Sequence, residues 1–277
     1  MAQELWKSSN TGIKRKGTTF KELQSLFVDK ITTKFIFEPL FCCKLNDESS
    51  DVKEILEFRE FDIVGVINDD DQVIGLAEKC ELNGGPIELF VKQISLSSVI
   101  SESTPISRLL NVLTERSFAF VITENNINGI VTIADVNKPI VRIYLFGIIS
   151  LFEIHLNYWI RVYHDTMSWR EHLSKNRLAK ASKLFEDRKG KNEELTLLEC
   201  IQICDKRTIL LATNDFIERF GFTNVQFEKL LTDIEQIRNE IAHSQNSIVS
   251  NLEWSLFVKT ISDAEDFLFK SEMILEI

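Results

Sequence analysis

The sequence predicts an α+β protein in which a half built of short strands and helices is followed by an all-α helical bundle. Before Asn137, strand-like apolar runs alternate with short helical patterns, whereas after it nearly every segment has helical period. The 10 glycines and 4 prolines among 277 residues favour regular elements. This length is enough for two domains. We place them at 20–138 and 139–277, after a flexible leader at 1–19.

The first half contains an internal repeat. Gly75 and Gly129 occupy the same place in its two copies, 54 residues apart. Each copy is a helix signal, a strand, a turn, a second strand and a further helix, too small to bury its apolar face alone, so we expect the two to pair. The segments are DVKEILEF, FDIVGVI, NDDDQ and VIGLAE in the first copy, and PISRLLNVL, FAFVITE, NNIN and GIVTIADV in the second.

The order of these elements and the segment GIVTIAD resemble a tandem pair of CBS (cystathionine β-synthase) domains. The family's ligand signature is a glycine, two apolar residues, Ser or Thr, two more residues and Asp, which Gly129, Thr132 and Asp135 match. The resemblance implies that an adenine nucleotide (AMP, ADP, ATP or a relative) binds between the repeats as a regulatory ligand.

The residue types suit such a ligand. Gly129 admits a close backbone approach, Thr132 and the next helix start can hold phosphate, and Asp135 can accept both ribose hydroxyls. The alternative is a plain helix N-terminus with a threonine cap. The first copy has Glu78 and Glu81 at the matching places, and carboxylates repel phosphate. We therefore expect one competent site and one degenerate site.

The helical half begins with a long apolar segment at 141–164, which is almost long enough to span a membrane. Glu153, Asn157 and Arg161 interrupt it every four residues, which puts three polar groups on one helix face. Such a stripe is costly in lipid. We therefore predict a core helix whose polar face lines a groove, and no membrane association.

The other predicted helices are at 169–188, 192–212, 223–243 and 251–270, with the sequence FGF as a break and Thr223 or Asn224 as an N-cap. The protein has a net charge of −10, which argues against strong non-specific nucleic-acid binding, yet 170–191 has eight basic and three acidic residues, a local balance of +5. That stretch is the best candidate for an anionic partner, and a solvated helix face explains it equally. The sequence CDKRT, 204–208, is interpreted as a helix-end charge cluster.

The sequence RNEIAH lies late in an amphipathic helix. At about 100° per residue, Arg238 falls at the edge of the apolar stripe, while Asn239 and His243 lie on the flank. An arginine turned toward the packed side needs an anion, because burying it unpaired is too costly. The anion is either Glu153, with His243 merely ending the helix, or a phosphate. The stripe consists of Phe227, Leu230, Leu231, Ile234, Ile237 and Ile241.

Residues 141–277 resemble the HEPN family (higher eukaryotes and prokaryotes nucleotide-binding), helical bundles that include metal-independent endoribonucleases. The family's motif is an arginine, a polar residue and then a histidine, matched by Arg238, Asn239 and His243. The resemblance implies a homodimer that cleaves RNA by 2′-OH attack on the adjacent phosphate to give a 2′,3′-cyclic phosphate. It also implies a toxin- or defence-type role and no DNA substrate.

The chemistry of these residues is suitable. His243 can exchange protons, Arg238 can stabilise the phosphorane, and Asn239 can orient either the phosphate or His243. One helix points Arg238 and His243 about 140° apart, which a two-fold partner would remedy. The alternative is a non-catalytic nucleotide sensor or scaffold that uses the helical half to dimerise or to dock a partner.

The remaining features set the cellular context. Five cysteines without disulfide or zinc spacing favour a reducing compartment, and the N-terminus has no signal-peptide pattern, so we expect a cytoplasmic protein. No metal-ligand cluster is apparent, and we expect no cofactor for catalysis. The helix from Val141 follows the CBS-like motif without a flexible linker, so a bound nucleotide is expected to alter cleavage.

Overall fold

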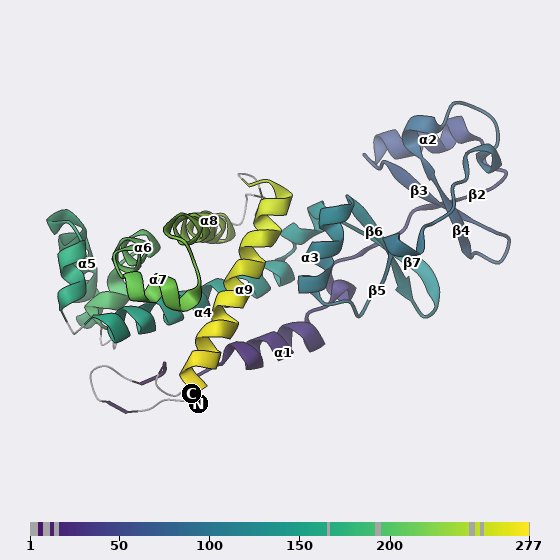
Figure 1. Ribbon diagram of the computed structural model, residues 1–277. Helices are drawn as coiled ribbons and strands as arrows, with labels where there is room; N and C mark the ends of the chain where they lie inside the picture. Colours follow the sequence, from purple (N-terminus) through teal and green to yellow (C-terminus); the bar gives the residue numbers. More distant parts are fainter. Residues whose placement is uncertain are drawn as a thin grey trace. The chain divides into compact units, whose positions relative to one another are not determined.

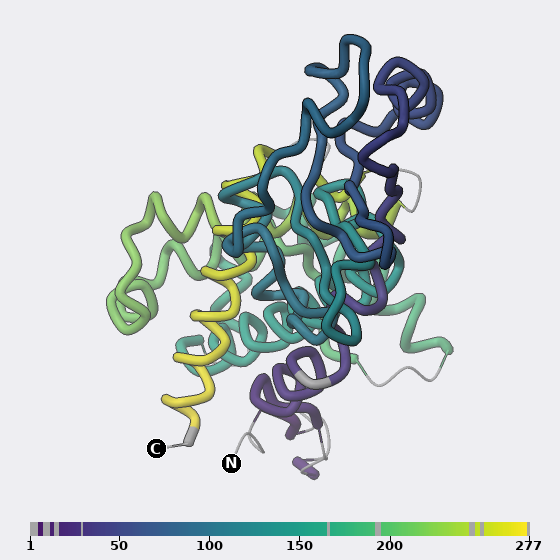
Figure 2. Tube along the Cα trace, turned by 90° about the vertical axis from the view of Figure 1, so that its right-hand side faces the viewer, coloured from purple at the N-terminus to yellow at the C-terminus, as the bar shows by residue number. Residues whose placement is uncertain are grey.

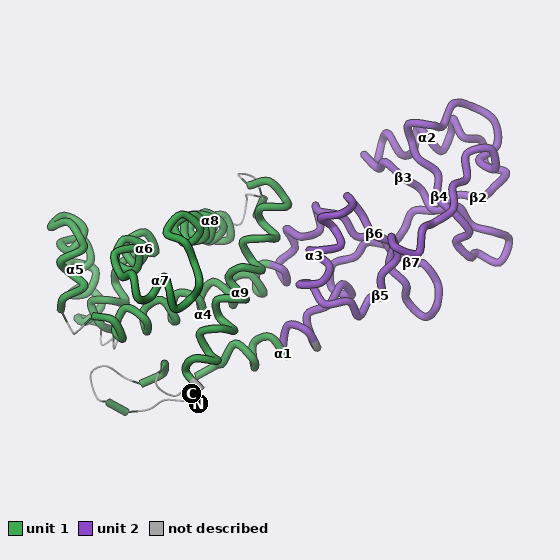
Figure 3. Tube along the Cα trace, in the orientation of Figure 1, with its two compact units in different colours: residues 1–25, 142–277 green, residues 26–141 purple. Residues whose placement is uncertain are grey.

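The computed structural model describes residues 5–7, 12–13, 17–164, 167–191, 195–243, 247–249 and 252–276. The chain divides into two compact units, 26–141 and 1–25 with 142–277 (Figure 3). Most of the predicted leader lies outside the described residues. The first turn of α1 (Phe20–Lys30) belongs to the helical unit rather than to the repeat module. The reason is that the N–H groups of Phe20 and Lys21 donate to the carboxylate of Glu272, on the last helix.

The unit at 26–141 contains the internal repeat as two similar sets of elements (Figure 1). The first set is β2 (Cys42–Lys44), α2 (Ser49–Phe58), β3 (Ile63–Ile67), β4 (Val73–Glu78) and η2 (Lys79–Glu81). The second is β5 (Val99–Ser101), α3 (Ile106–Glu115), β6 (Phe118–Thr123), β7 (Asn126–Thr132) and η5 (Ile133–Asn137). The predicted order of helix, strand, turn and strand is therefore confirmed, but each set begins with an additional strand, β2 or β5, and closes with a short 3-10 turn instead of a helix. The other elements are η1 (Thr33–Phe35), β1 (Glu38–Pro39), η3 (Ile87–Phe90) and η4 (Leu96–Ser98).

The two sheets share one pairing pattern. In the order β2-β3-β4, β2 runs parallel to β3, which pairs antiparallel with β4. In the order β1-β7-β6-β5, β5 is parallel to β6, and β6 is antiparallel to β7. Both hairpins have a register shift at the same place, Val66/Ile67 and Val121/Ile122. The strand β1 does not join the sheet of β2, the next strand along the chain, but pairs antiparallel with β7 in the second sheet.

The two repeat glycines allow these extra segments to approach. A Cβ atom on Gly129 would lie 2.3 Å from Phe37 Cδ2 and 3.2 Å from the Glu38 carbonyl oxygen. On Gly75 it would lie 2.5 Å from Val91 Cγ1 and 2.7 Å from the Lys92 carbonyl oxygen. Both glycines thus have a structural role, because the chain's own backbone crosses them where any side chain would stand.

The unit that contains 142–277 is helical. Its elements are α4 (Pro139–Tyr163), η6 (Ser168–His172), α5 (Lys175–Lys189), η7 (Leu197–Cys200), α6 (Ile203–Leu211), α7 (Asn214–Phe220), α8 (Asn224–Ala242) and α9 (Trp254–Glu276). Aromatic side chains join them: Phe267 of α9 lies 4.7 Å from Phe220 and 4.9 Å from Phe152, centroid to centroid, and Trp159 lies 5.2 Å from Phe220. Each such pair adds about 0.5–1.5 kcal/mol beyond area burial.

The helix α4 is long and apolar enough to cross a membrane, with mean hydropathy 1.6 over its most apolar 18-residue window, half of which is buried within the protein. Its buried side chains include Leu145, Ile148, Phe152, Leu156 and Ile160. This spacing of three and four residues is that of a helix packed in a protein core. The aromatic contacts of α4 with α7 and α9 agree with the predicted core helix.

The single helix predicted at 192–212 is wrong. Residues 192–194 lie outside the described residues, and the rest forms η7 and α6 with an extended residue, Ile201, between them. Two capping boxes explain the break. The Thr196 N–H donates to Glu199 Oε2 at 2.6 Å, and the Gln202 N–H donates to Asp205 Oδ2 at 3.1 Å. Each carboxylate starts a new helix instead of lying within one.

Candidate functional site

The RNEIAH motif occupies the last turn of α8. Thr223 caps this helix as predicted, because its Oγ1 accepts the Gln226 N–H at 3.2 Å. At the other end the His243 N–H donates to the carbonyls of Asn239 and Glu240, both at 3.2 Å, and His243 leaves the helix with φ −99° and ψ 91°. Asn239 and His243 are both exposed. The motif therefore ends a helix at the protein surface.

Arg238 is paired with Glu153. Its Nε atom lies 3.2 Å from Glu153 Oε1, and 52% of its side chain is exposed. The expectation that Arg238 turns into the packed side is thus only partly correct, since the arginine lies at the boundary. The second oxygen of Glu153 lies 3.1 Å from Lys206 Nζ, so one carboxylate on α4 joins cations from α6 and α8.

Lys206 is the residue that sequence reasoning missed. Its side chain is 2% exposed. Burial lowers the pKa of its ammonium group, and Glu153 opposes that shift. The predicted helix-end charge cluster does lie in the first turns of α6, but Asp205 and Lys206 in it are buried, at 5% and 2% exposure. The signal was present: Lys206 stands three residues after Ile203 and three before Ile209, on the apolar face of α6.

The polar stripe of α4 is only partly buried. Below Glu153, Asn157 is 8% exposed, and none of the described residues donates a hydrogen bond to its Oδ1 atom. Burial lowers the pKa of the Arg161 guanidinium, and the nearby Glu199 carboxylate opposes that shift. The stripe therefore consists of one buried residue, Asn157, between two partly exposed ones, Glu153 and Arg161.

The C-terminal end of α8 is held by α4. Arg142 Nη1 donates to the carbonyls of Glu240 and Ile241 at 3.1 and 3.2 Å, which satisfies acceptors that a helix end leaves open. On the same part of α4, Ile143 and Phe146 are 57% and 63% exposed. An exposed apolar pair thus neighbours the end of the motif.

The CBS-like residues form a second polar cluster, in the unit at 26–141. The Thr132 N–H and hydroxyl donate to Asp135 Oδ2 at 2.7 and 3.1 Å, and Lys138 Nζ lies 2.8 Å from Asp135 Oδ1. Lys138 also contacts Glu38 and the carbonyl of Ile36. Burial lowers the pKa of Lys138, but hydrogen bonds to Asp135 and Glu38 outweigh it, so the pKa is raised. Both oxygens of Asp135 are thus held within the chain.

At the matching positions in the first repeat, Glu78 and Glu81 both form ion pairs with Lys92. Lys92 Nζ lies 2.6 Å from Glu81 and 3.2 Å from Glu78, and the hydrogen bond to Glu81 is the main cause that raises the pKa of Lys92. Two carboxylates stand where Thr132 and Asp135 stand in the second repeat. The two copies therefore differ in charge at the matching positions.

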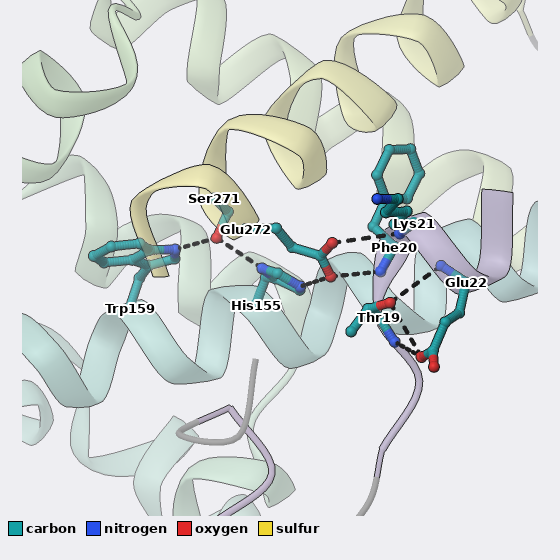
Figure 4. Close-up of polar contacts among 8 residues, drawn as sticks. All are labelled: Thr19, Phe20, Lys21, Glu22, His155, Trp159, Ser271 and Glu272. Atoms are coloured by element: carbon teal, nitrogen blue, oxygen red, sulfur yellow. Dashed lines mark hydrogen bonds and ion pairs between the residues drawn. The ribbon is translucent and has the colours of Figure 1, made fainter. Parts of the chain in front are cut away.

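A buried cluster links α4 to α9 (Figure 4). Trp159 Nε1 donates to Ser271 Oγ at 2.6 Å, and the same oxygen lies 2.7 Å from His155 Nδ1. The indole N–H can only donate, so the Ser271 oxygen is its acceptor and the Ser271 hydroxyl donates its own proton to His155 Nδ1. The neutral imidazole therefore carries its proton on Nε2. That atom faces Glu272 at 3.9 Å. The order Ser, His, Glu looks catalytic, but Ser271 and His155 are fully buried, so the cluster is structural.

The His155 cluster predicts a pH-dependent stability. Burial lowers the pKa of His155 to about 4 from 6.5. Between these values the unfolded chain binds a proton that the folded chain rejects, so stability is lost as pH falls from 6.5 to 4, by about 3 kcal/mol at most. Urea unfolding at pH 7 and pH 5 measures this loss. His155→Gln should flatten it, and His172→Gln, at a partly exposed ring, should not. Equal slopes in all three proteins would contradict the assignment.

The described residues contain no group of three or more His, Cys, Asp or Glu that could hold a metal ion. His164 and His172 stack with ring centroids 5.1 Å apart, and His164 Nε2 lies 3.0 Å from Thr213 Oγ1. All five cysteines are free thiols, and burial raises the pKa of Cys43 to about 12. A thiolate at that position is strongly disfavoured near neutral pH.

No protein-family model matches the sequence, and no curated protein matches it. Solved structures similar to the N-terminal part of the chain are CBS domains. The CBS domains of a transcriptional regulator from Streptococcus pneumoniae are 18% identical over 39% of this chain and 98% of theirs, with a TM-score of 0.35. CBSX2 in complex with AMP is 18% identical over 40% and 97%, with a TM-score of 0.35. The CBS domain of a bacterial CNNM/CorC family Mg2+ transporter in complex with ATP is 19% identical over 44% and 94%, with a TM-score of 0.34.

Proposed function

We propose that the helical unit is a metal-independent endoribonuclease of the HEPN type and that the repeat unit is its adenine-nucleotide sensor. The observation that carries the first part is the location of the motif. Arg238, Asn239 and His243 are all exposed at the C-terminal end of α8, and Arg238 is already paired with a carboxylate. An arginine that holds one anion at the surface can exchange it for a phosphate.

The proposed reaction divides the roles among these residues. His243 exchanges protons with the ribose 2′-OH and the leaving 5′-oxygen. Arg238 stabilises the negative charge that grows on the phosphorus-bound oxygens, and Asn239 orients the phosphate or the imidazole. The 2′-oxygen forms a bond to phosphorus as the bond to the 5′-oxygen breaks, which leaves a 2′,3′-cyclic phosphate and a free 5′-hydroxyl.

The active form in this proposal is a homodimer. Arg238 and His243 point in different directions around α8, and a two-fold partner brings one chain's arginine to the other's histidine. The exposed Ile143 and Phe146 support this, because they lie beside the α8 end that Arg142 holds. An apolar surface next to the site gives a second chain something to bury.

The test of the proposed function is incubation of the purified protein with RNA in EDTA. We expect cleavage products that end in a 2′,3′-cyclic phosphate, and a cleavage rate that changes when an adenine nucleotide is added. An absence of cleavage under every nucleotide condition would favour the alternative, a sensor or scaffold whose helical unit only dimerises or docks a partner.

The nucleotide site proposed in the repeat unit centres on Thr132 and Asp135. Binding requires the Asp135 carboxylate to exchange Lys138 for the ribose hydroxyls, which frees the Lys138 ammonium for a phosphate. Gly129 lets β1 pair closely with β7, the strand that ends at Thr132. The helix α4 begins at Pro139, directly after Lys138, so a shift of Lys138 is transmitted along the chain to the helix that contains Glu153.

This site makes a prediction for thermal unfolding. AMP, ADP or ATP at about 100 times its dissociation constant should stabilise the folded protein by about 2.7 kcal/mol. Asp135→Ala should abolish the ligand-dependent shift, whatever it does to the starting Tm. Glu81→Ala, at the matching position of the first repeat, serves as the control and should leave the shift intact. A shift that survives Asp135→Ala would place the ligand elsewhere.

A further inference from the structure

The helix α5 is an exposed cationic surface on an acidic protein. Of its fifteen residues only Ala181 is buried. The stretch 175–184 contains no acidic residue, while Lys175, Lys180 and Lys183 are all exposed. On a helix these three lysines fall within an arc of about 140° and a length of about 12 Å, on the side away from Ala181.

The three ammonium groups are not used within the protein. Among the residues that the structure describes, none forms an ion pair or hydrogen bond with Lys175, Lys180 or Lys183. Arg177 differs, because its Nη1 atom lies 2.7 Å from the buried Asp205 and anchors α5 to α6. Arg177 thus anchors α5 to α6, whereas the side chains of Lys175, Lys180 and Lys183 are exposed to solvent.

Contacts connect α5, through α6, to the helix that contains the RNEIAH motif. Arg177 of α5 binds Asp205 of α6, and the next residue but one, Arg207, donates to Thr232 Oγ1 of α8 at 2.5 Å. Figure 1 shows α5, α6 and α8 in one row of the helical unit. An RNA strand bound at the motif would therefore have to cross α6 to reach α5.

The surface chemistry favours a phosphodiester chain over a membrane. A membrane-bound amphipathic helix needs a broad apolar face to insert, whereas the large apolar residue with the greatest exposure on α5 is Leu184, at 39%. Between the lysines stand the small or polar residues Asn176, Ala179 and Ser182. Lysine ammonium groups on such a face act as point charges for phosphates of any sequence.

We propose that α5 binds the RNA substrate by its phosphate backbone, outside the cleavage site. This inference rests on the proposed ribonuclease function. It predicts that most of the affinity for RNA is electrostatic and independent of base sequence. It also predicts that short substrates, which cannot reach from the motif to α5, are cleaved without help from the three lysines.

The experiment measures binding of the full-length protein to a 2′-O-methyl oligoribonucleotide, which has no 2′-OH to attack. In the triple variant Lys175→Gln, Lys180→Gln, Lys183→Gln we expect the slope of log K against log salt to fall by about 2, since each phosphate contact contributes about 0.7. The affinity at 0.1 M salt should fall by about 100-fold, because such a slope amounts to about two decades between 0.1 and 1 M. Cleavage of a dinucleotide should stay unchanged.

A second triple variant is the matched control. Lys21→Gln, Lys259→Gln and Lys270→Gln remove the same charge from exposed positions on α1 and α9, and this protein should bind RNA almost as wild type does. Equal losses in both triple variants would overturn the assignment to α5. So would lysine-dependent binding to anionic phosphatidylserine vesicles without binding to the oligonucleotide.

The two proposals fail in different ways. If wild type cleaves RNA and the α5 variant binds as tightly as wild type, the α5 proposal is wrong and the ribonuclease proposal stands. If wild type binds the oligonucleotide through α5 but never cleaves RNA, the ribonuclease proposal is wrong and α5 remains an RNA-binding surface.

Discussion

His243→Ala is expected to lower the rate of RNA cleavage by about 100- to 10,000-fold, because it removes the group that exchanges protons with the 2′-OH and the leaving oxygen. Arg238→Ala is expected to lower it by about 100- to 1,000-fold, the usual effect of deleting one donor to a developing oxyanion. His243 is exposed and Arg238 half-exposed, so neither change should unfold the protein. Single-turnover cleavage in EDTA measures both effects.

His172→Ala is the control for His243, since it removes a partly exposed imidazole from the same unit. Its cleavage rate should match wild type. If His243→Ala and Arg238→Ala cleave as fast as this control, the motif is only the polar end of α8. The ribonuclease proposal is also contradicted if the cleavage activity does not follow this protein through successive purification steps, because the activity then belongs to a contaminating nuclease.

A mixing experiment tests whether the site is shared between two chains. In a two-fold dimer with Arg238 from one chain and His243 from the other, a heterodimer of the two inactive variants has one intact site. Random mixing makes half of the dimers heterodimers, so activity should return to about a quarter of the wild-type value. No recovery, despite exchange of subunits shown by mass spectrometry, would place the whole site in one chain.

Glu153→Gln is expected to destabilise the folded protein by about 3–5 kcal/mol, because it leaves the buried Lys206 ammonium without its countercharge. Lys206 is 2% exposed, and Glu153 lies 3.1 Å from it. The double variant Glu153→Gln, Lys206→Met should recover most of this loss, since it replaces the buried charge with an apolar side chain of similar length. The free energy of unfolding in urea is the measurement.

Asp263→Asn provides the control for this ion pair. It breaks the bridge of Asp263 to Lys259, 2.6 Å long, on the exposed face of α9. An exposed pair contributes about 0.2–1 kcal/mol, so the change should be small. A loss of stability in Glu153→Gln no larger than this would mean that Lys206 is solvated or neutral. The Glu153 carboxylate would then not stabilise the packing of α4 against α6 and α8.

Much of the fold could be predicted because its causes are local. The repeat showed itself through strand period and through Gly75 and Gly129, which stand where a neighbouring segment crosses each sheet. The long helix α4 and the cap at Thr223 followed from apolar spacing and side-chain type. The helix break near Ile201 did not, because Glu199 and Asp205 suit a continuous helix as well as two capping boxes. Only their actual hydrogen bonds distinguish these structures.

The site was predictable only in part. The sequence placed Arg238, Asn239 and His243 on one helix and named Glu153 as an anion for Arg238, since period and charge are sufficient for that. It did not predict that Lys206 competes for the same carboxylate, because a charge next to Asp205 and Arg207 looks like surface. Likewise Asp135 could be matched to a ligand signature, but its pairing with Lys138 depends on the path of the chain after η5.

By itself the sequence determined the α+β class, the repeat, the apolar faces and the residue types available for phosphate chemistry, because these depend on neighbours within a few residues. The tertiary structure decided which charges are buried and which remain in water. Glu153, Lys206 and Arg238 are far apart in the chain, and their pairing exists only once α4, α6 and α8 pack together. The cost of burying a charge depends on its surroundings in space, which short-range sequence patterns do not specify.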